Sequence, residues 1–408
     1  MTTSLSSTAK HFDTGIGPVG FREKLACRWF GCLQVGRLTV EFPSGAQRTF
    51  VGPADGPQAL LKIHDLRVIT RMLLSSDIGF AESYMDGDWD TPDLTSLLAL
   101  GATNGEALDG ALQASRLIKA VNRLRHAFRA NTRRGSRRNI AFHYDLGNDF
   151  YGLWLDETMS YSSGLFTDSE EPMIGAQNRK YRRLADKLDL QPGDRVLEIG
   201  CGWGGFAEIA AAEYGCRVVC LTLSQEQAAY ARARMAGLGL DHRVEIRIQD
   251  YRDVTGTFDK VVSIEMFEAV GEDRWPTYFD VLRRCLKPGG RAGLQVITIA
   301  EDRFDYYRRT PDFIQRYIFP GGMLPSPSVL EAVVAESGLA VTDQLFFGAS
   351  YAETLRRWDQ AFLLNWSRLE GIGFDQRFRR MWRYYLSYCE AGFDHGHIDV
   401  GQFIIEAK

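Results

Sequence analysis

The stretch that most constrains the fold is Arg195–Ala212, which reads RVLEIGCGWGGFAEIAAA. A short apolar run ends at Ile199, a cluster of glycines follows, and from Phe206 apolar residues recur at helical spacing. This order predicts a strand, a tight turn and a helix. Glycines in such a turn permit positive φ and close approach of a ligand, while the helix start offers unpaired N–H groups. The pattern predicts a nucleotide-type pocket, with a purely structural turn as the alternative.

Strand-like runs recur after this stretch and alternate with helical patterns. They lie at residues 216–223, 244–249, 258–264 and 293–299. Alternation of this kind predicts an α/β fold with a mainly parallel sheet covered on both faces. The ligand of such a sheet lies beyond the carboxyl ends of the strands, so those ends are expected to surround one crevice.

The first part of the chain differs in character. Gly36–Val51 contains two β-rich runs separated by a Pro-Ser-Gly turn at residues 43–45, which predicts a hairpin. Helical spacing follows, and no catalytic constellation is present. We expect a small α+β domain over residues 1–110, acting as a structural or substrate-docking module, then a linker over 111–138 and a second domain over 139–408.

The linker is basic. From Ala111 to Tyr144 the chain has no Asp or Glu, and its cations accompany apolar residues at helical spacing. A basic amphipathic helix with an arginine-rich tail fits an anionic membrane surface, where each cation contributes on the order of 1 kcal/mol. A solvated interdomain linker is the equal alternative. Nucleic acid fits less well, because no aromatic stacking platform is interleaved.

Composition narrows the class of protein. The chain has 408 residues, of which 45% are hydrophobic, enough for two domains with a large core. A net charge of −4 disfavours general binding to nucleic acid. The seven cysteines show no metal-ligand spacing and predict reduced thiols in a cytosolic protein. The chain shows no export signal and no apolar run of about 18 residues, so we expect neither export nor a membrane span.

The residues around the expected crevice narrow its ligand. A dinucleotide dehydrogenase would carry an acidic residue after the second strand, but the chain has LTLSQEQ there, with Thr222, Ser224 and Gln227 as neutral hydrogen-bonding groups. No GxxxxGK[ST] phosphate loop is present. The glycine turn, Asp250 after the third strand and the LKPGG turn at 286–290 together resemble a class I S-adenosylmethionine methyltransferase.

Further motifs resemble the cyclopropane-fatty-acyl-phospholipid synthase and mycolic acid cyclopropane synthase family. They are FHYDLGNDFYGLWLDETMSYSSGLF at 142–166, EIGCGWGGF at 198–206, LTLSQEQ at 221–227, QDYRD at 249–253, SIEMFEAVG at 263–271, YIFPGG and LPS within 317–326, and IDVGQF at 398–403. The resemblance implies a Rossmann-like methyltransferase domain and, more weakly, an N-terminal lipid-docking domain. It implies a cytoplasmic enzyme, peripherally attached to the inner face of the membrane, that acts on unsaturated phospholipids. The sequence leaves the oligomeric state open, with a homodimer among the possibilities.

The resemblance also assigns the cofactor contacts. It implies that S-adenosylmethionine is held by residues from four motifs: Tyr161 and Ser162, Gly200 and Gly202 at the methionine end, Thr222 and Gln227 near the ribose, and Asp250, Tyr251 and Arg252 near the adenine. Arg252 could instead be a surface cation.

The chemistry implied is methyl transfer to an acyl-chain double bond, which forms a carbocation that aromatic faces such as that of Tyr351 can stabilise. In the family a bound bicarbonate removes the proton that closes the cyclopropane. Glu268, Ile297 and Tyr351 match its cradle, whereas Ser163 and Gln295 stand where the family has Cys and His. Ser and Gln still donate hydrogen bonds, so we expect ring closure, with a methyl-branched unsaturated chain as the alternative. A small-molecule methyltransferase and a non-catalytic lipid-binding protein remain as less favoured hypotheses, and no metal is expected.

Overall fold

The structure is a computed structural model that describes residues 14–105, 107–108, 146–168 and 170–407. The predicted basic segment at 111–138 lies outside these residues. The chain forms two compact units. One includes the described residues up to 108 together with 374–395, and the other includes 146–373 and 396–407.

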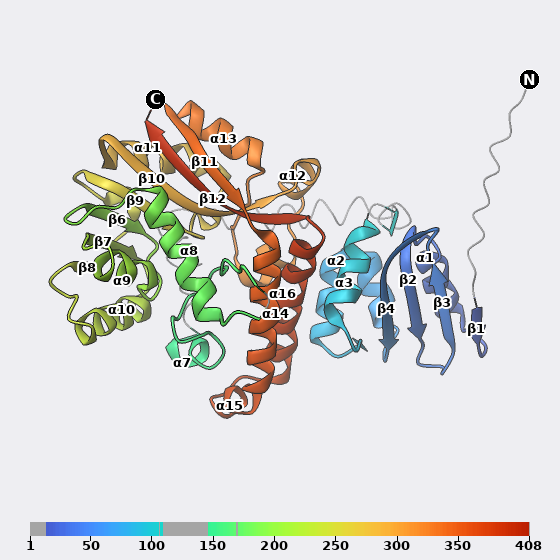
Figure 1. The fold of residues 1–408 in the computed structure, drawn as a ribbon. Helices are drawn as coiled ribbons and strands as arrows, with labels where there is room; N and C mark the ends of the chain where they lie inside the picture. The colour runs from blue at the N-terminus through green and yellow to red at the C-terminus, as the bar shows by residue number, and fades with distance from the viewer. Residues whose placement is uncertain (1–13, 106, 109–145, 169, 408) are drawn as a thin grey trace, which may run out of the picture. The chain divides into compact units, whose positions relative to one another are not determined.

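The N-terminal unit is built on a five-stranded sheet with the order β1-β3-β2-β4-β5 (Figure 1). The strands are β1 (Thr14–Ile16), β2 (Val35–Glu41), β3 (Gln47–Val51), β4 (Ala54–Ile63) and β5 (Trp89–Asp90). Its helices are α1 (Phe21–Phe30), α2 (Arg67–Met85), α3 (Leu94–Thr103) and α16 (Gln376–Asp394). The predicted hairpin is confirmed: β2 and β3 pair antiparallel, and Gly45 in their turn has a φ of 82°.

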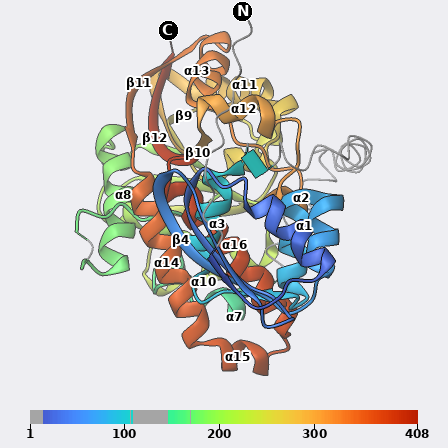
Figure 2. The ribbon, with the colours of Figure 1, turned by 90° about the vertical axis from the view of Figure 1, so that its right-hand side faces the viewer.

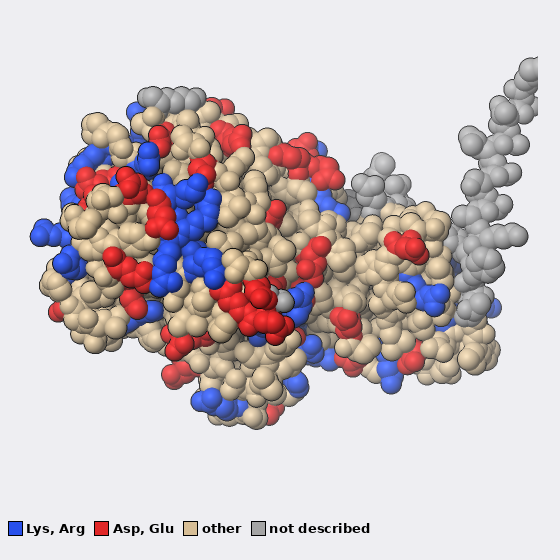
Figure 3. Space-filling view, viewed as in Figure 1, with Lys and Arg blue, Asp and Glu red and all other residues tan. Residues whose placement is uncertain are grey.

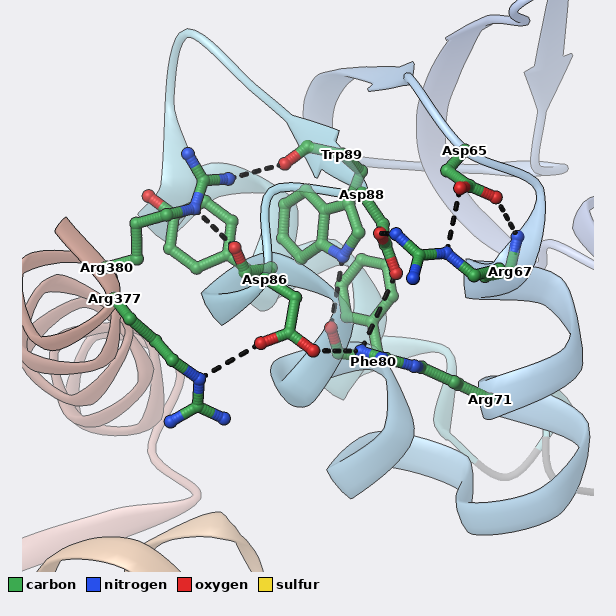
Figure 4. Close-up of polar contacts among 10 residues, drawn as sticks. Asp65, Arg67, Arg71, Phe80, Asp86, Asp88, Trp89, Arg377 and Arg380 are labelled. Atoms are coloured by element: carbon green, nitrogen blue, oxygen red, sulfur yellow. Dashed lines mark hydrogen bonds and ion pairs between the residues drawn. The ribbon is translucent and has the colours of Figure 1, made fainter.

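Helix α16 comes from the far end of the sequence, yet it packs within this unit against α2 and α3. Figure 4 shows how two of its arginines anchor it. Arg377 pairs with Asp86 at 3.0 Å, and Arg380 donates to the carbonyl of Trp89 at 2.6 Å and to the carbonyl of Tyr84. The sequence analysis had assigned residues 376–394 to the second domain.

The second unit is built on a seven-stranded sheet with the order β11-β12-β10-β9-β6-β7-β8. Its strands are β6 (Arg195–Ile199), β7 (Arg217–Thr222), β8 (Val244–Ile248), β9 (Phe258–Ile264), β10 (Leu286–Ile299), β11 (Leu339–Phe346) and β12 (Ile398–Ala407). The pairs from β10 to β8 are parallel, and β12 is antiparallel to both of its neighbours. The predicted mainly parallel α/β sheet is therefore confirmed. The LKPGG segment belongs to β10 rather than to a separate turn, and the strand register shifts between Leu286 and Arg291.

Helices cover both faces of this sheet (Figures 1 and 2). The helices of this unit are α7 (Asn148–Tyr151), α8 (Met173–Lys187), α9 (Gly205–Ala212), α10 (Gln225–Gly237), α11 (Trp275–Cys285), α12 (Glu301–Tyr307), α13 (Pro327–Glu336), α14 (Gly348–Leu364) and α15 (Trp366–Gly371). Short helical turns stand at η1 (Tyr251–Asp253), η2 (Phe267–Ala269), η3 (Glu272–Arg274) and η4 (Ile314–Ile318).

The core has two parts because successive strand residues point to opposite faces of the sheet. Val196 packs with α8, α9 and α10, whereas the next residue, Leu197, packs with α11 and α13. In β9, Val262 packs in the same cluster as Val196, and Val261 packs in the same cluster as Leu197. These strands therefore carry apolar residues on both faces, as expected for a sheet buried on both sides.

Lys and Arg side chains gather over α8 on the face shown in Figure 3, but each of four pairs with a carboxylate. The pairs are Arg179–Glu171 at 2.6 Å, Arg182–Glu213 at 2.7 Å, Arg183–Asp343 at 2.8 Å and Lys187–Asp343 at 2.7 Å. None of the helices in the described part of the chain has the length and apolar character needed to cross a membrane.

Candidate functional site

The glycine turn after β6 has the geometry that its sequence predicts. Gly200, Gly202 and Gly204 have φ of 83°, 52° and 88°. A Cβ on Gly200 would lie 2.7 Å from Cγ of Met266, whereas a Cβ on Gly202 would have no heavy atom of the described chain within 4 Å apart from its immediate neighbours. Gly200 therefore permits close packing, and Gly202 leaves open space beside the backbone. A ligand can approach the turn there, so the turn fits the methionine end of S-adenosylmethionine.

The residues predicted to contact the ribose lie at the end of β7. Thr222 Oγ1 donates to Gln227 Oε1 at 2.8 Å and accepts from the backbone N–H of Ser224 at 3.1 Å. Ser224 in turn caps α10 by accepting from the N–H of Gln227 at 3.2 Å. These bonds fix two polar side chains beside the glycine turn, as the sequence predicts.

The three residues predicted near the adenine form a local cluster after β8. Both carboxylate oxygens of Asp250 accept hydrogen bonds from the Arg252 guanidinium, at 2.8 and 2.6 Å. Arg252 thus neutralises a buried carboxylate rather than being a free surface cation. Burial raises the pKa of Tyr251 to about 12, so this phenol stays neutral.

Tyr161 and Ser162, the remaining predicted cofactor contacts, lie against two different groups. The ring of Tyr161 lies 5.3 Å from that of Trp358, which is buried on α14. Ser162 Oγ accepts a hydrogen bond from Nζ of Lys180 on α8. Lys180 is fully buried, and this burial lowers its pKa to about 7, against the opposing effect of the charges of Glu265 and Asp156.

The predicted catalytic residues converge on a carboxylate that the sequence analysis did not single out, Glu265. Its Oε1 accepts from Gln295 Nε2 at 2.7 Å and from the backbone N–H of Ser163 at 2.9 Å. Its Oε2 accepts from the hydroxyl of Tyr351 at 2.6 Å. The Ser163 hydroxyl instead donates to the carbonyl of Gly164 at 2.8 Å, so only the backbone of Ser163 serves this cluster.

The other two predicted catalytic residues pair with each other. The backbone N–H of Ile297 donates to Glu268 Oε1 at 2.6 Å, whereas Glu268 Oε2 is buried and has no hydrogen-bond partner. Burial, with a smaller contribution from the charge of Glu265, raises the pKa of Glu268 to about 8. The site therefore holds two carboxyl groups in different states: Glu268 retains its proton at neutral pH, and Glu265 has three hydrogen-bond donors.

Glu265 and Lys180 are the two site residues that the sequence reasoning missed. Glu265 directly follows β9 at the predicted edge of the sheet, so the position of the strand end was an available signal. Lys180 lies in a charged helix, and nothing in its local sequence separates it from its exposed neighbours. The predicted residues of the glycine turn, of 222–227, of 250–252 and Glu268 follow the carboxyl ends of β6, β7, β8 and β9, as expected. Gln295 and Ile297 lie on β10, Tyr351 on α14, and residues 161–163 in the segment between α7 and α8.

The chain is similar in sequence to known lipid-modifying methyltransferases and cyclopropane synthases. Residues 131–403 match the family model described as mycolic acid cyclopropane synthetase. The chain is 42% identical over 367 residues to the tuberculostearic acid methyltransferase UfaA1 of Mycobacterium tuberculosis, which covers 88% of this chain and 85% of that protein. It is 36% identical to the cyclopropane-fatty-acyl-phospholipid synthase of Escherichia coli, over 86% of this chain and 87% of that protein.

A solved structure agrees with the sequence comparisons. The crystal structure of mycolic acid cyclopropane synthase CmaA1 complexed with SAH and CTAB has a TM-score of 0.62 and 32% identity to this chain. The match covers 66% of this chain and 97% of that one.

Proposed function

Because the chain belongs to the mycolic acid cyclopropane synthetase family of S-adenosylmethionine-dependent methyltransferases, we propose that it methylates the double bond of an unsaturated phospholipid acyl chain and releases a methyl-branched, ring-free product. The observation that carries the product assignment is the altered cradle. Gln295 stands where the resemblance implies a His, and Ser163 turns its hydroxyl toward Gly164 instead of into the site. The similarity to a tuberculostearic acid methyltransferase over most of the chain supports the same choice.

The choice of a phospholipid substrate rests on the similarity to the Escherichia coli cyclopropane-fatty-acyl-phospholipid synthase. We assign binding of an anionic membrane surface to the basic segment at 111–138 and substrate docking to the N-terminal unit. Both roles are among those expected from the sequence.

We assign the cofactor to the residues around the glycine turn. Bound S-adenosylmethionine supplies an electrophilic methyl group on a sulfonium centre. Gly200 and Gly202 would hold its methionine end, Thr222 and Gln227 its ribose, and the segment from Asp250 to Arg252 its adenine. Tyr161 and Ser162 would supply further contacts.

The aromatic and acidic residues near the expected methyl donor favour methyl transfer to an alkene. An isolated alkene is a weak nucleophile, so it must be oriented with water excluded. The ring of Trp358 lies 5.3 Å from that of Tyr161, tilted, and 6.2 Å from that of Tyr351, edge to face. The faces of such rings can stabilise a developing carbocation without reacting with it. Glu268, protonated at neutral pH, adds no second negative charge.

The test is incubation of the purified protein with S-adenosylmethionine and vesicles of monounsaturated phosphatidylglycerol, followed by mass spectrometry of the released fatty acids. We expect the acyl chain to gain one CH2 unit and to keep one carbon–carbon double bond. A cyclopropane product has the same mass, so ozonolysis separates the two, because the branched alkene is cleaved and the cyclopropane is not. A product that resists ozonolysis would establish ring closure instead. The absence of methylation with several double-bond positions would refute the lipid assignment.

A further inference from the structure

The residues expected to cradle a bicarbonate ion are already occupied by a side chain of the protein. Ser163, Gln295 and Tyr351 were expected to hold that ion, and all three donate hydrogen bonds of 2.6–2.9 Å to the carboxylate of Glu265. Ile297, a fourth member of the expected cradle, donates to Glu268. The hydrogen bonds expected to hold a bicarbonate ion are directed at the carboxyl groups of Glu265 and Glu268 instead, and the ion would lie beside the negative charge of Glu265. The described site therefore does not fit bicarbonate.

A carboxylate and a bicarbonate ion present the same chemical group, a planar pair of oxygens that share one negative charge. Carboxylate oxygens together accept about four hydrogen bonds. Glu265 accepts three from the cradle, which leaves room for one more proton-donating group. We propose that Glu265 is the catalytic base of this enzyme, accepting the proton that the transferred methyl group loses, in place of a bound bicarbonate; the proposal rests on the proposed function.

The backbone at Glu265 supports a functional role. Its φ is 48°, in the left-handed region that a non-glycine residue adopts only with strain. The position is fixed by a hydrogen bond of 2.8 Å from the Glu265 N–H to the carbonyl of Gln295. The next residue, Met266, packs against Gly200 of the cofactor turn. A strained glutamate is thereby held beside the expected methyl donor.

The two other ionisable groups of the cluster fit the role less well. Glu268 has a pKa raised to about 8 and carries its own proton at neutral pH. Lys180 donates to Ser162 Oγ. Burial raises the pKa of the Glu265 carboxyl, whereas the charge of Lys180 and the hydrogen bonds from Tyr351, Gln295 and Ser163 oppose this and favour its ionised form. Glu265 is thus the group that can accept a proton.

The proposed step is balanced. The alkene electron pair forms a bond to the methyl carbon, and the carbon–sulfur bond breaks with its electrons remaining on sulfur. A hydride then moves from the methylated carbon to the neighbouring cationic carbon. A C–H bond of the new methyl group then breaks, its electrons form a C=CH2 double bond with the methylated carbon, which is now the cationic one, and the proton passes to a carboxylate oxygen of Glu265.

The test compares the wild type with Glu265→Gln and Glu265→Gly in buffer freed of carbon dioxide. The glutamine keeps the size of the side chain without its basicity, and the glycine relieves the positive φ while opening space for an anion. We expect wild-type turnover to be unchanged by bicarbonate. Both variants should lose about 10²–10⁴-fold in turnover, the usual contribution of a general base. Glu265→Gly should regain at least about tenfold with added bicarbonate or formate. Glu272→Gln, on an exposed glutamate paired with Arg308, is the matched control and should retain wild-type turnover.

A binding experiment separates this proposal from the proposed function, because it needs no lipid turnover. In the presence of S-adenosylhomocysteine, 13C-labelled bicarbonate should bind to Glu265→Gly and not to the wild type, as measured by NMR. Binding to the wild type, or wild-type turnover by Glu265→Gln, would overturn the assignment of Glu265. A wild type that methylates no lipid would instead refute the proposed function, while the NMR result would still decide whether Glu265 excludes bicarbonate.

Discussion

Replacement of Tyr351 by Phe isolates one hydrogen bond in the Glu265 cluster. The Tyr351 hydroxyl donates to Glu265 Oε2 at 2.6 Å, and Phe keeps the ring against Trp358. A hydrogen bond to a charged group contributes about 1.5–3 kcal/mol. Since one pKa unit corresponds to about 1.4 kcal/mol, its loss should raise the pKa of Glu265 by about one to two units.

The pKa of Glu265 should rise because the Tyr351 hydrogen bond stabilises the ionised form of the carboxylate. The phenol donates to the ionised carboxylate and so opposes the effect of burial, which raises the pKa of Glu265. Without this hydrogen bond, the carboxylate of Glu265 stays protonated up to a higher pH. It cannot act as a base below that pH. The acid limb of the kcat profile should therefore move up by about one to two pH units.

The assay is kcat against pH with vesicles, together with the affinity for S-adenosylhomocysteine, which should not change. Tyr230→Phe, on a half-buried tyrosine of α10, is the matched control and should leave the profile unaltered. A loss of equal size at every pH, with no shift of the acid limb, would refute the reasoning. It would mean that the Tyr351 hydroxyl acts on the substrate and not through Glu265.

Two further predictions concern the cofactor turn and the N-terminal unit. Gly200→Ala places a Cβ 2.7 Å from Met266 Cγ at a φ of 83°, so calorimetry should show weaker S-adenosylhomocysteine binding, whereas Gly237→Ala at the exposed end of α10 should not. Arg380→Met removes the donor to Trp89 and Tyr84 and should destabilise the docking of α16 by about 1–3 kcal/mol, measured by hydrogen exchange. Arg377→Met, at a half-exposed ion pair, should cost less than about 1 kcal/mol, and equal effects of the two substitutions would contradict this account.

The second unit was readily predicted because its strands are buried on both faces. Apolar runs such as 258–264 coincide with strand β9, and the glycines before α9 have the expected positive φ. Strand ends in a parallel sheet meet at one edge, so the residues placed there from sequence were brought together. In the second unit, the local pattern of apolar residues and glycines therefore agrees with the observed strands and turns.

The assignment of α16 and the burial of Lys180 could not be predicted in the same way. Helix α16 is amphipathic and charged like many surface helices, and its partners Asp86 and Trp89 lie almost 300 residues away in the sequence. Lys180 is buried by its position on α8 and not by its neighbours in sequence. Both features depend on tertiary contacts, and the local periodicity of the sequence carries no information about them.

From the sequence, the departures at Ser163 and Gln295 left ring closure as the expectation and a methyl-branched chain as the alternative. The structure gives them another reading, because the Ser163 backbone and the Gln295 amide donate to Glu265. Ring closure and formation of a methyl-branched alkene remove a proton from the same methyl carbon, but a hydride must move before the branched alkene can form. A base that takes the proton only after the hydride shift therefore gives the branched product. Three hydrogen bonds fix the carboxylate of Glu265, and burial raises its pKa, so the position of this base relative to the methyl group, and not a weakened basicity, decides when the proton leaves.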